Sequence, residues 1–140
     1  MPITADVFVV EKPSILINTI EINCAAGSVS LVPTDKQADI ETFCNPGGER
    51  PTATHWTLDV DVKLSYGTGT TALWNQLRAL AKTKVTVVIK PSEAAVSDAN
   101  PSATVTVWMP SIPFINAGIG EASKVTLTMP VVGEPVFATT

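Results

Sequence analysis

The chain has 140 residues, of which 45% are apolar and 16% are charged, and its formal net charge is -4. This length fits one domain that can bury a core without disulfide or metal support. Tight nucleic-acid binding requires clustered Lys and Arg, and the nine basic residues here are scattered, so the composition argues against it. Abundant Val and Thr, punctuated by 11 prolines and 8 glycines, favour a protein built from short β-strands.

The cysteine and histidine content argues against a structural metal site. Cys24 and Cys44 are the only cysteines and His55 is the only histidine, whereas a zinc site needs about four nitrogen or sulfur ligands. We expect both cysteines to be free thiols in a reducing compartment, with a disulfide between them as the alternative. The N-terminal segment carries Asp6 and Glu11 and lacks a long apolar core, so we do not expect a signal peptide. No run approaches the roughly 18 apolar residues of a membrane helix.

The first third of the chain predicts short strands followed by a long loop. Apolar runs predict three strands, at 6–10, 15–22 and 28–32. The second run is broken near Asn18, and the third is ended by Pro33. Residues 33–54 hold few apolar side chains and contain the breaker sequence Asn-Pro-Gly-Gly at 45–48. The sequence therefore predicts a long loop at 33–54, and loops this long in a compact domain are usually functional or mobile.

Residues 55–66 alternate strictly between apolar and polar side chains, which predicts one half-buried strand with a solvated face. Asp59, Asp61 and Lys63 lie together on the polar face, where neighbouring acids usually form a solvated stripe. The apolar face carries Trp56, Leu58, Val60, Val62, Leu64 and Tyr66.

The second half of the chain predicts one helix and several more strands. Leu73, Leu77 and Leu80 recur at helical spacing, which predicts a helix at about 71–82 with a threonine at its N-cap. Strands are expected at 84–90, 102–109 and 123–129, with a last apolar run at 131–137. Trp108 falls on the polar side of its strand, where it is either exposed or covered by another subunit. Seven or eight short strands and one helix predict a mainly β fold, a sandwich or barrel with a single flanking α-helix.

Residues 67–72 match the pattern G-x-G-x-x-A of dinucleotide-binding folds, but their context argues against a cofactor site. The strand before that loop should be buried on both faces and uniformly apolar. Here Asp59, Asp61 and Lys63 would sit inside it, and the chain offers no further helices to cover a parallel sheet. We interpret the segment as a Gly-rich turn that precedes a structural helix.

Three other groups of residues could suggest a catalytic or sugar-binding site, but each has a simpler structural explanation. Cys44, His55 and Asp59 could form a nucleophile, a base and an orienting acid, but no flanking motif supports such a site. Paired carboxylates on the central strand could do acid–base chemistry, although a solvated acidic stripe is the commoner case. The tryptophans could form a sugar platform, but Trp56 and Trp74 fall on apolar faces expected in the core. We therefore expect no catalytic residues, no cofactor and no metal.

Three motifs, taken in chain order, carry a resemblance to a known family. The long loop ends with ETFCNPG at 41–47, the helix opens with ALWNQLR at 72–78, and the closing strands read KVTLTMPVVGEP at 124–135. With the alternating strand between the first two, this order resembles the major tail (tail tube) proteins of long, non-contractile-tailed bacteriophages, especially those of actinobacterial hosts. The resemblance covers about residues 5–138.

The resemblance implies a structural virion protein and not an enzyme. It implies a β-sandwich with one flanking helix, and six-membered rings that stack into the hollow tube through which the genome is ejected. It further implies a place in the virion tail, assembly in the host bacterial cytoplasm, and contacts with tape measure, tail terminator and tip proteins. Phage DNA would pass without sticking, and neither a cofactor nor a membrane is involved.

Two sets of candidate residues follow from the resemblance. The loop at 33–54 would contact the adjacent ring, with candidates Asp35, Asp39, Ile40, Phe43 and Cys44. Asp59 and Asp61 would line the lumen, where ring repetition brings acids close enough to repel phosphate despite screening over about 8 Å. That polar face could instead meet the outer solvent or a neighbouring subunit. A tail terminator of similar fold and a monomeric ligand- or carbohydrate-binding β-sandwich are the alternative functions.

Overall fold

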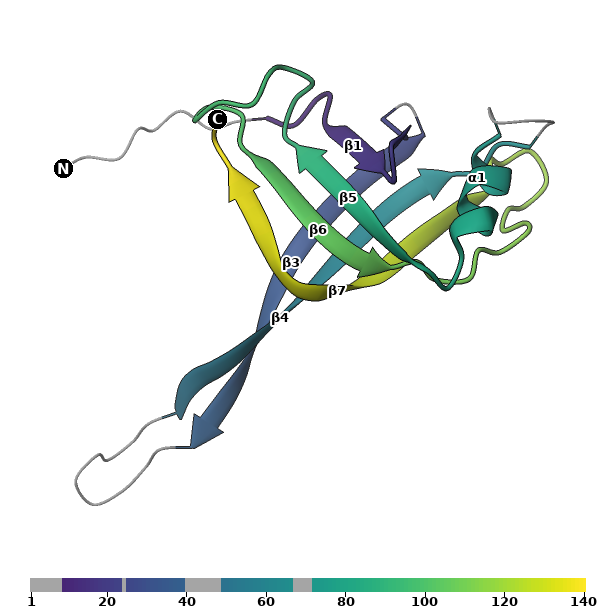
Figure 1. Ribbon diagram of the computed structural model, residues 1–140. Coiled ribbons are helices and arrows are strands. Elements are labelled where there is room, and N and C mark those ends of the chain that lie inside the picture. Colours follow the sequence, from purple (N-terminus) through teal and green to yellow (C-terminus); the bar gives the residue numbers. More distant parts are fainter. Residues whose placement is uncertain (1–8, 24, 40–48, 67–71) are drawn as a thin grey trace, which may run out of the picture.

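Antiparallel strands make up most of the computed structural model, which describes residues 9–23, 25–39, 49–66 and 72–140 (Figure 1). Within these residues seven strands form one sheet in the order β2-β1-β5-β6-β7-β4-β3, and every neighbouring pair is antiparallel. The elements are β1 (Ser14–Ile17), β2 (Ile20–Glu21), β3 (Ala26–Asp39), β4 (Glu49–Lys63), α1 (Leu73–Leu80), β5 (Lys84–Lys90), β6 (Ser102–Trp108) and β7 (Lys124–Ala138). The predicted mainly β fold is confirmed, and the residues that the structure describes contain a single helix.

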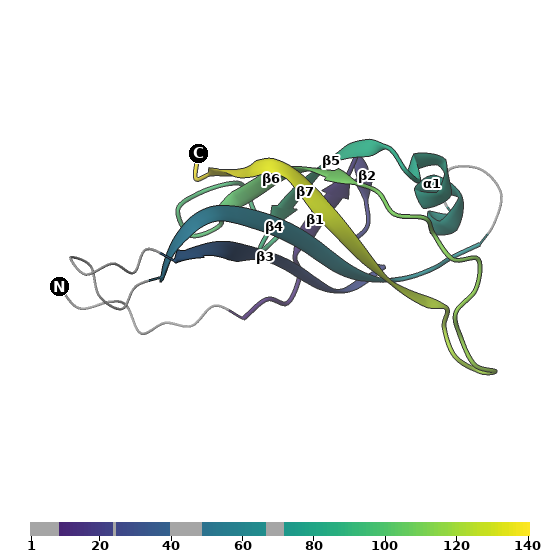
Figure 2. The same ribbon diagram turned by 90° about the horizontal axis from the view of Figure 1, so that it is seen from below.

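The sheet folds over on itself along β7. Residues 124–130 of β7 pair with β4, whereas residues 131–138 pair with β6. Near the change of partner, Pro130 lacks a backbone donor, Gly133 adopts a φ of 76°, and the register with β6 shifts. The result is two facing layers (Figure 2): the β4 layer, made of β3, β4 and the first half of β7, and the β5 layer, made of β2, β1, β5, β6 and the second half of β7.

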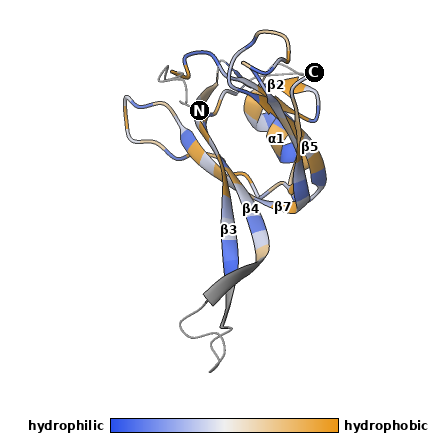
Figure 3. Cartoon of the chain, turned by 90° about the vertical axis from the view of Figure 1, so that its left-hand side faces the viewer, coloured by the Kyte–Doolittle hydropathy of each residue, from blue (hydrophilic) through white to orange (hydrophobic). Residues whose placement is uncertain are grey.

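The core lies between the two layers and is closed at one end by α1. The predicted alternation along the central strand is confirmed from Leu58 to Leu64, since Leu58, Val60, Val62 and Leu64 are all buried, but the strand ends at Lys63 and Tyr66, predicted on the same face, is exposed. Leu77 on α1 is fully buried as well. Burying a side chain of this size contributes roughly 1.5–3 kcal/mol, which has to exceed the conformational entropy lost on folding. In Figure 3 the apolar residues are concentrated in this body of the molecule.

The helix is shorter than the predicted helix at 71–82. It spans Leu73–Leu80, and the Leu73 amide donates a hydrogen bond to Ser65 Oγ at 2.9 Å, which satisfies one of the free amides at the helix start. The helix ends before Lys82, which has a φ of 61°, the left-handed conformation that commonly terminates helices. The threonine expected at the N-cap lies outside the described residues.

The predicted loop at 33–54 is wrong for its described residues. The strand β3 continues through Pro33 to Asp39, and β4 already begins at Glu49, so the two strands pair where a loop was expected. A proline is tolerated because β3 lies at the edge of the sheet, where one side of the backbone makes no ladder hydrogen bonds. Few apolar residues occur there because the described side chains are exposed on both faces.

Other strand boundaries differ in smaller ways. The runs at 123–129 and 131–137 form a single strand, β7, because its two halves find different partners. The run at 6–10 is not a strand at its two described residues. The break near Asn18 is confirmed: Asn18 and Thr19 have φ values of 46° and 72° and form the two-residue turn between β1 and β2.

Candidate assembly surfaces

The far ends of β3 and β4 leave the body as a two-stranded ribbon, here called the arm (residues 34–39 and 49–55; Figure 1). The strand β7 pairs with β4 only from Thr57 onward, so along the arm β3 and β4 pair with no other described strand. The pairing continues along the arm with one irregularity after Lys36. At about 3.3 Å per residue, six strand residues extend about 20 Å.

Polar, exposed side chains cover the described part of the arm, which is largely hydrophilic in Figure 3. Thr34, Asp35 and Lys36 are exposed on β3, and so are the residues that face them on β4. Thr54 Oγ1 donates a hydrogen bond to Asp35 Oδ1 at 2.8 Å across the two strands. A two-stranded ribbon without an apolar face is only marginally stable in water. The arm is therefore a surface that a binding partner would stabilise.

The predicted inter-ring residues divide between the arm and the segment beyond it. Asp35 and Asp39 lie on the β3 strand of the arm. Outside the described residues lie Ile40, Phe43, Cys44 and Cys24. Reduced thiols at both cysteines therefore stay a prediction, to be checked by mass spectrometry without reductant.

The two layers do not close completely around the core. Strand β3 ends the strand order on one side and the two-residue β2 ends it on the other, so both present an edge to which no described strand is paired. A groove of about 600 Å³ lies between β1 and the start of β3, with Ile15, Asn23 and Val29 in its lining. Open edges of this kind are templates for pairing with another chain.

The outer face of the β4 layer carries the two candidate lumen acids. Asp61 is exposed and accepts hydrogen bonds from Ser28 Oγ at 2.9 Å and from Thr126 Oγ1, one from each neighbouring strand. Asp59 is half-buried, and its Oδ1 is shielded from solvent with no hydrogen-bond partner among the described residues. Asp61 is therefore the more accessible of the two acids.

The hydrogen bonds to Asp61 make its ionisation sensitive to the fold. Those from Thr126 and Ser28, helped by the charge of Lys124, hold the pKa of Asp61 below its ordinary value of 3.8. A carboxyl with a lower pKa in the folded than in the unfolded protein stabilises the fold above that ordinary value, and the contribution is lost as the pH falls through the folded pKa. We expect Asp61→Asn to have a lower urea midpoint of unfolding than wild type at pH 7. The difference between the two midpoints should shrink as the pH falls through the pKa of Asp61 in the folded protein.

An NMR titration of the Asp61 carboxyl measures the pKa directly. Thr126→Val is the matched variant, because it removes the first of the two hydrogen bonds and keeps the carboxyl, and it should raise the pKa toward 3.8. A midpoint difference between wild type and Asp61→Asn that is the same at every pH would show that the carboxylate charge is not its cause.

Three aromatic residues from separate parts of the chain meet beside α1, and we call them the aromatic cluster. Trp74 packs edge-on against Phe114 with ring centroids 5.2 Å apart, and Tyr66 lies 6.1 Å from Trp74 and 5.7 Å from Phe114. The Tyr66 hydroxyl donates to the Phe114 carbonyl, and the Arg78 guanidinium lies 4.5 Å over the Trp74 ring. Trp74 Nε1 is shielded and has no acceptor among the described residues. The one signal in the sequence was the i, i+4 spacing of Trp74 and Arg78, which places both on one side of α1.

The tryptophans do not form a common platform. Trp56 is half-buried against Phe137, with ring centroids 5.9 Å apart, so its predicted place in the core is wrong: it lies where the arm leaves the body. Trp74 is also half-buried but packs against the core. Trp108 is exposed, with Lys84 Nζ 5.2 Å from the centre of its ring.

The residues considered for catalysis are not brought together either. His55 and Asp59 lie four residues apart on one strand, roughly 13 Å, which is beyond hydrogen-bond reach. Cys44 lies outside the described residues. In the described ranges no group of three or more His, Cys, Asp or Glu side chains is placed to hold a metal ion.

Two comparisons of the sequence with known proteins were without a match. No protein-family model matches the sequence, and no curated protein is significantly similar to it. In the described part of the chain, no helix has the length and apolar character needed to cross a membrane. A functional assignment therefore depends on the fold, the surfaces above and the motifs in the sequence.

Proposed function

We propose that this chain is the structural subunit of a phage tail tube. In this proposal six copies form a ring, the rings stack into a hollow tube in the virion tail, and the genome passes through the tube during ejection. The observation that carries the proposal is the arm, a polar ribbon that extends about 20 Å without packing on its own body. The resemblance to tail tube proteins supplies the ring and its six-fold symmetry.

The outer face of the β5 layer supports lateral contacts within a ring. Cross-strand pairs there join Thr104 to Val136 and Thr106 to Val132, and both valines are exposed. Trp108, at the end of the same strand, is exposed too. Exposed valine and tryptophan side chains beside half-buried threonines are typical of an interface that another subunit covers. With the open edges of the sheet, it would let each copy contact two neighbours.

The outer face of the β4 layer suits the lumen. It carries hydroxyl groups and the carboxylates of Asp59 and Asp61, so it remains hydrated. Repeated around a ring, these acids would keep DNA phosphates from adhering. The same tube would enclose a tape measure protein and end at terminator and tip proteins, which are the partners that we propose.

Concentrated wild-type protein should form stacked rings of uniform width in negative-stain images. Light scattering should rise with protein concentration, and a tube map at side-chain resolution should place Asp61 at the lumen. Single rings that never stack would favour a tail terminator instead. A protein that stays monomeric at every concentration and salt would overturn the proposal.

A monomeric ligand-binding β-sandwich is the second candidate, favoured by the groove between β1 and β3. Its volume of about 600 Å³ falls within the range of small-molecule sites. Asn23 lies in its lining, where Asn23 Oδ1 accepts a hydrogen bond from the Ile15 amide at 2.7 Å and Asn23 Nδ2 donates to Glu93 at 3.2 Å. Saturable binding of a glycan to a monomer in an array experiment would favour this candidate over the tube.

A further inference from the structure

A second surface, at the end of the molecule away from the arm, carries exposed apolar and basic side chains. Figures 1 and 2 both place α1 at this end and the arm at the other. Tyr66 and Phe114 of the aromatic cluster are 47% and 63% exposed, and Ile115 beside them is 65% exposed. Exposed aromatic residues next to an arginine are the usual composition of a protein-binding hot spot. We call these three residues, with Arg78 and Lys82, the receiving surface.

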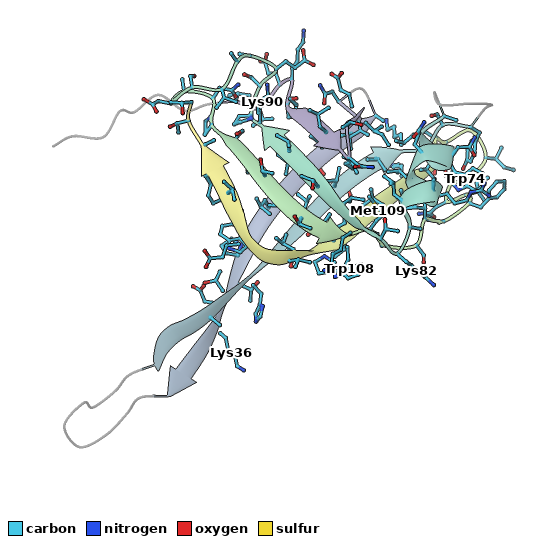
Figure 4. The ribbon with its side chains drawn as sticks, in the orientation of Figure 1. Lys36, Trp74, Lys82, Lys90, Trp108 and Met109 are labelled. Carbon is cyan, nitrogen blue, oxygen red and sulfur yellow. The ribbon has the colours of Figure 1, made fainter. Side chains whose placement is uncertain are left out.

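Several basic residues gather at the end of the molecule that carries the receiving surface, where one of them, Lys124, also interacts with Asp61. Five of the nine Lys and Arg residues lie at this end. Arg78 is in α1 and Lys82 follows it, Lys63 ends β4, and Lys84 and Lys124 begin β5 and β7. Figure 4 shows Lys82 just beyond the C-terminal end of α1, at the same end of the molecule as Trp74. Lys63 and Lys124 face each other across β4 and β7, an unfavourable arrangement of like charges. Within the described residues, neither Arg78 nor Lys82 has a carboxylate partner.

The arm carries the opposite charge. The arm contains three acidic residues, Asp35, Asp39 and Glu49, and two basic ones, Lys36 and Arg50, so its formal charge is 2 - 3 = -1. The Asp35 carboxylate is exposed on the described part of the arm. Because the acidic arm and the basic receiving surface lie at opposite ends, they cannot meet within one copy. Two copies can join them, and such a heterologous contact repeats head to tail.

We infer that the receiving surface binds the arm of a second copy, and that this contact stacks one ring on the next. The inference rests on the proposed tail tube function. The ribbon lies against the exposed aromatic rings, and its acidic side chains meet Arg78 and Lys82. The contact covers the exposed aromatic rings and stabilises the arm, which is only marginally stable by itself. It weakens with added salt, because charges at an exposed contact are screened over about 8 Å at physiological ionic strength.

Two complementary variants test this contact. The surface variant carries Arg78→Glu and Phe114→Asp, and the arm-less variant has residues 35–54 replaced by Asn-Gly. Each variant alone should stop before stacking, because each lacks one half of the contact. When each variant is assembled separately and the two are then mixed in equal amounts, they should form pairs of rings or 1:1 dimers and nothing longer, since only the arms of one variant and the receiving surfaces of the other are intact. Analytical ultracentrifugation and negative-stain images distinguish these species from tubes.

Lys12→Glu is the matched control, because it makes the same change of charge as Arg78→Glu at an exposed site outside both surfaces. It should form tubes as wild type does. Circular dichroism checks that each variant is folded. If the surface variant does not fold, Arg78→Gln takes its place and should raise the protein concentration needed for stacking at least about tenfold, as loss of a hot-spot arginine does.

The outcomes separate the inference from the proposed function. Normal tubes from the folded surface variant, or a mixture that forms no pairs, would overturn the inference while wild-type tubes still support a tail tube. Wild-type protein that forms no tubes, with pairs present in the mixture, would overturn the function and support the contact between copies.

Discussion

Replacing residues 35–54 by the dipeptide Asn-Gly should give a folded protein that does not polymerise. The residues left at the new turn, Thr34 and His55, are cross-strand partners, and Asn-Gly closes such a pair as a two-residue hairpin turn. The pairing of β4 with β7, which begins at Thr57, stays intact. Because the removed side chains that the structure describes are exposed, we expect the free energy of unfolding to change by less than about 1 kcal/mol. Tubes should be absent at concentrations where wild type is fully assembled.

Urea unfolding and light scattering on the same samples test both halves of this prediction. Thr54→Val is the matched control, because it removes the hydrogen bond to Asp35 but leaves the backbone pairing of the arm in place. This control should still assemble, at a somewhat higher concentration. Tubes of normal width and length from the arm-less protein would show that stacking uses another part of the molecule.

Leu127→Ala should have the largest effect on stability. Leu127 lies on β7 and is fully buried in the core between the two layers. It is the cross-strand partner of Val60 on β4. Truncating a buried leucine costs about 2–5 kcal/mol, because burial is lost and a cavity remains. Since small domains are stable by only about 5–15 kcal/mol, the variant should lose a large share of its stability. Urea or thermal unfolding followed by tryptophan fluorescence measures this loss.

Thr128→Ala is the control for the core variant, because Thr128 is the next residue of the same strand and points to the opposite, exposed face. It should cost less than about 1 kcal/mol. Equal losses from the two variants would contradict the two-faced arrangement of β7.

The pattern of apolar residues was sufficient to predict the buried face of the alternating strands over most of their length, although Trp56 and Tyr66 at the ends of the central pattern are not in the core. Successive side chains on a strand point to opposite sides, so a strict alternation leaves little choice once one face meets the core. Val60 and Val62 are buried and Asp61 and Lys63 exposed for this reason. The strand β5, at 84–90, has the bounds that the pattern predicted.

The candidate surfaces could be predicted only in part. The sequence located the segment that leaves the body, including Asp35 and Asp39, because its residues are too polar to be buried. It did not predict that this segment pairs into an arm, because a polar strand at a sheet edge lacks the alternation that identifies half-buried strands. The aromatic cluster was missed because Tyr66, Trp74 and Phe114 belong to segments with no common pattern.

Local pattern alone predicted the mainly β fold class, the one helix of the described residues and the inward faces of the alternating strands over most of their length, because these depend on residues close together in the chain. Contacts between distant segments decided the rest. Strand β3 continues past Pro33 because β4 pairs with it, and β7 is one strand because β4 and β6 each pair with half of it. A strand ends where its hydrogen-bond partner ends, and that partner is chosen by the packing of the whole sheet, so such boundaries cannot be read from a short stretch of sequence.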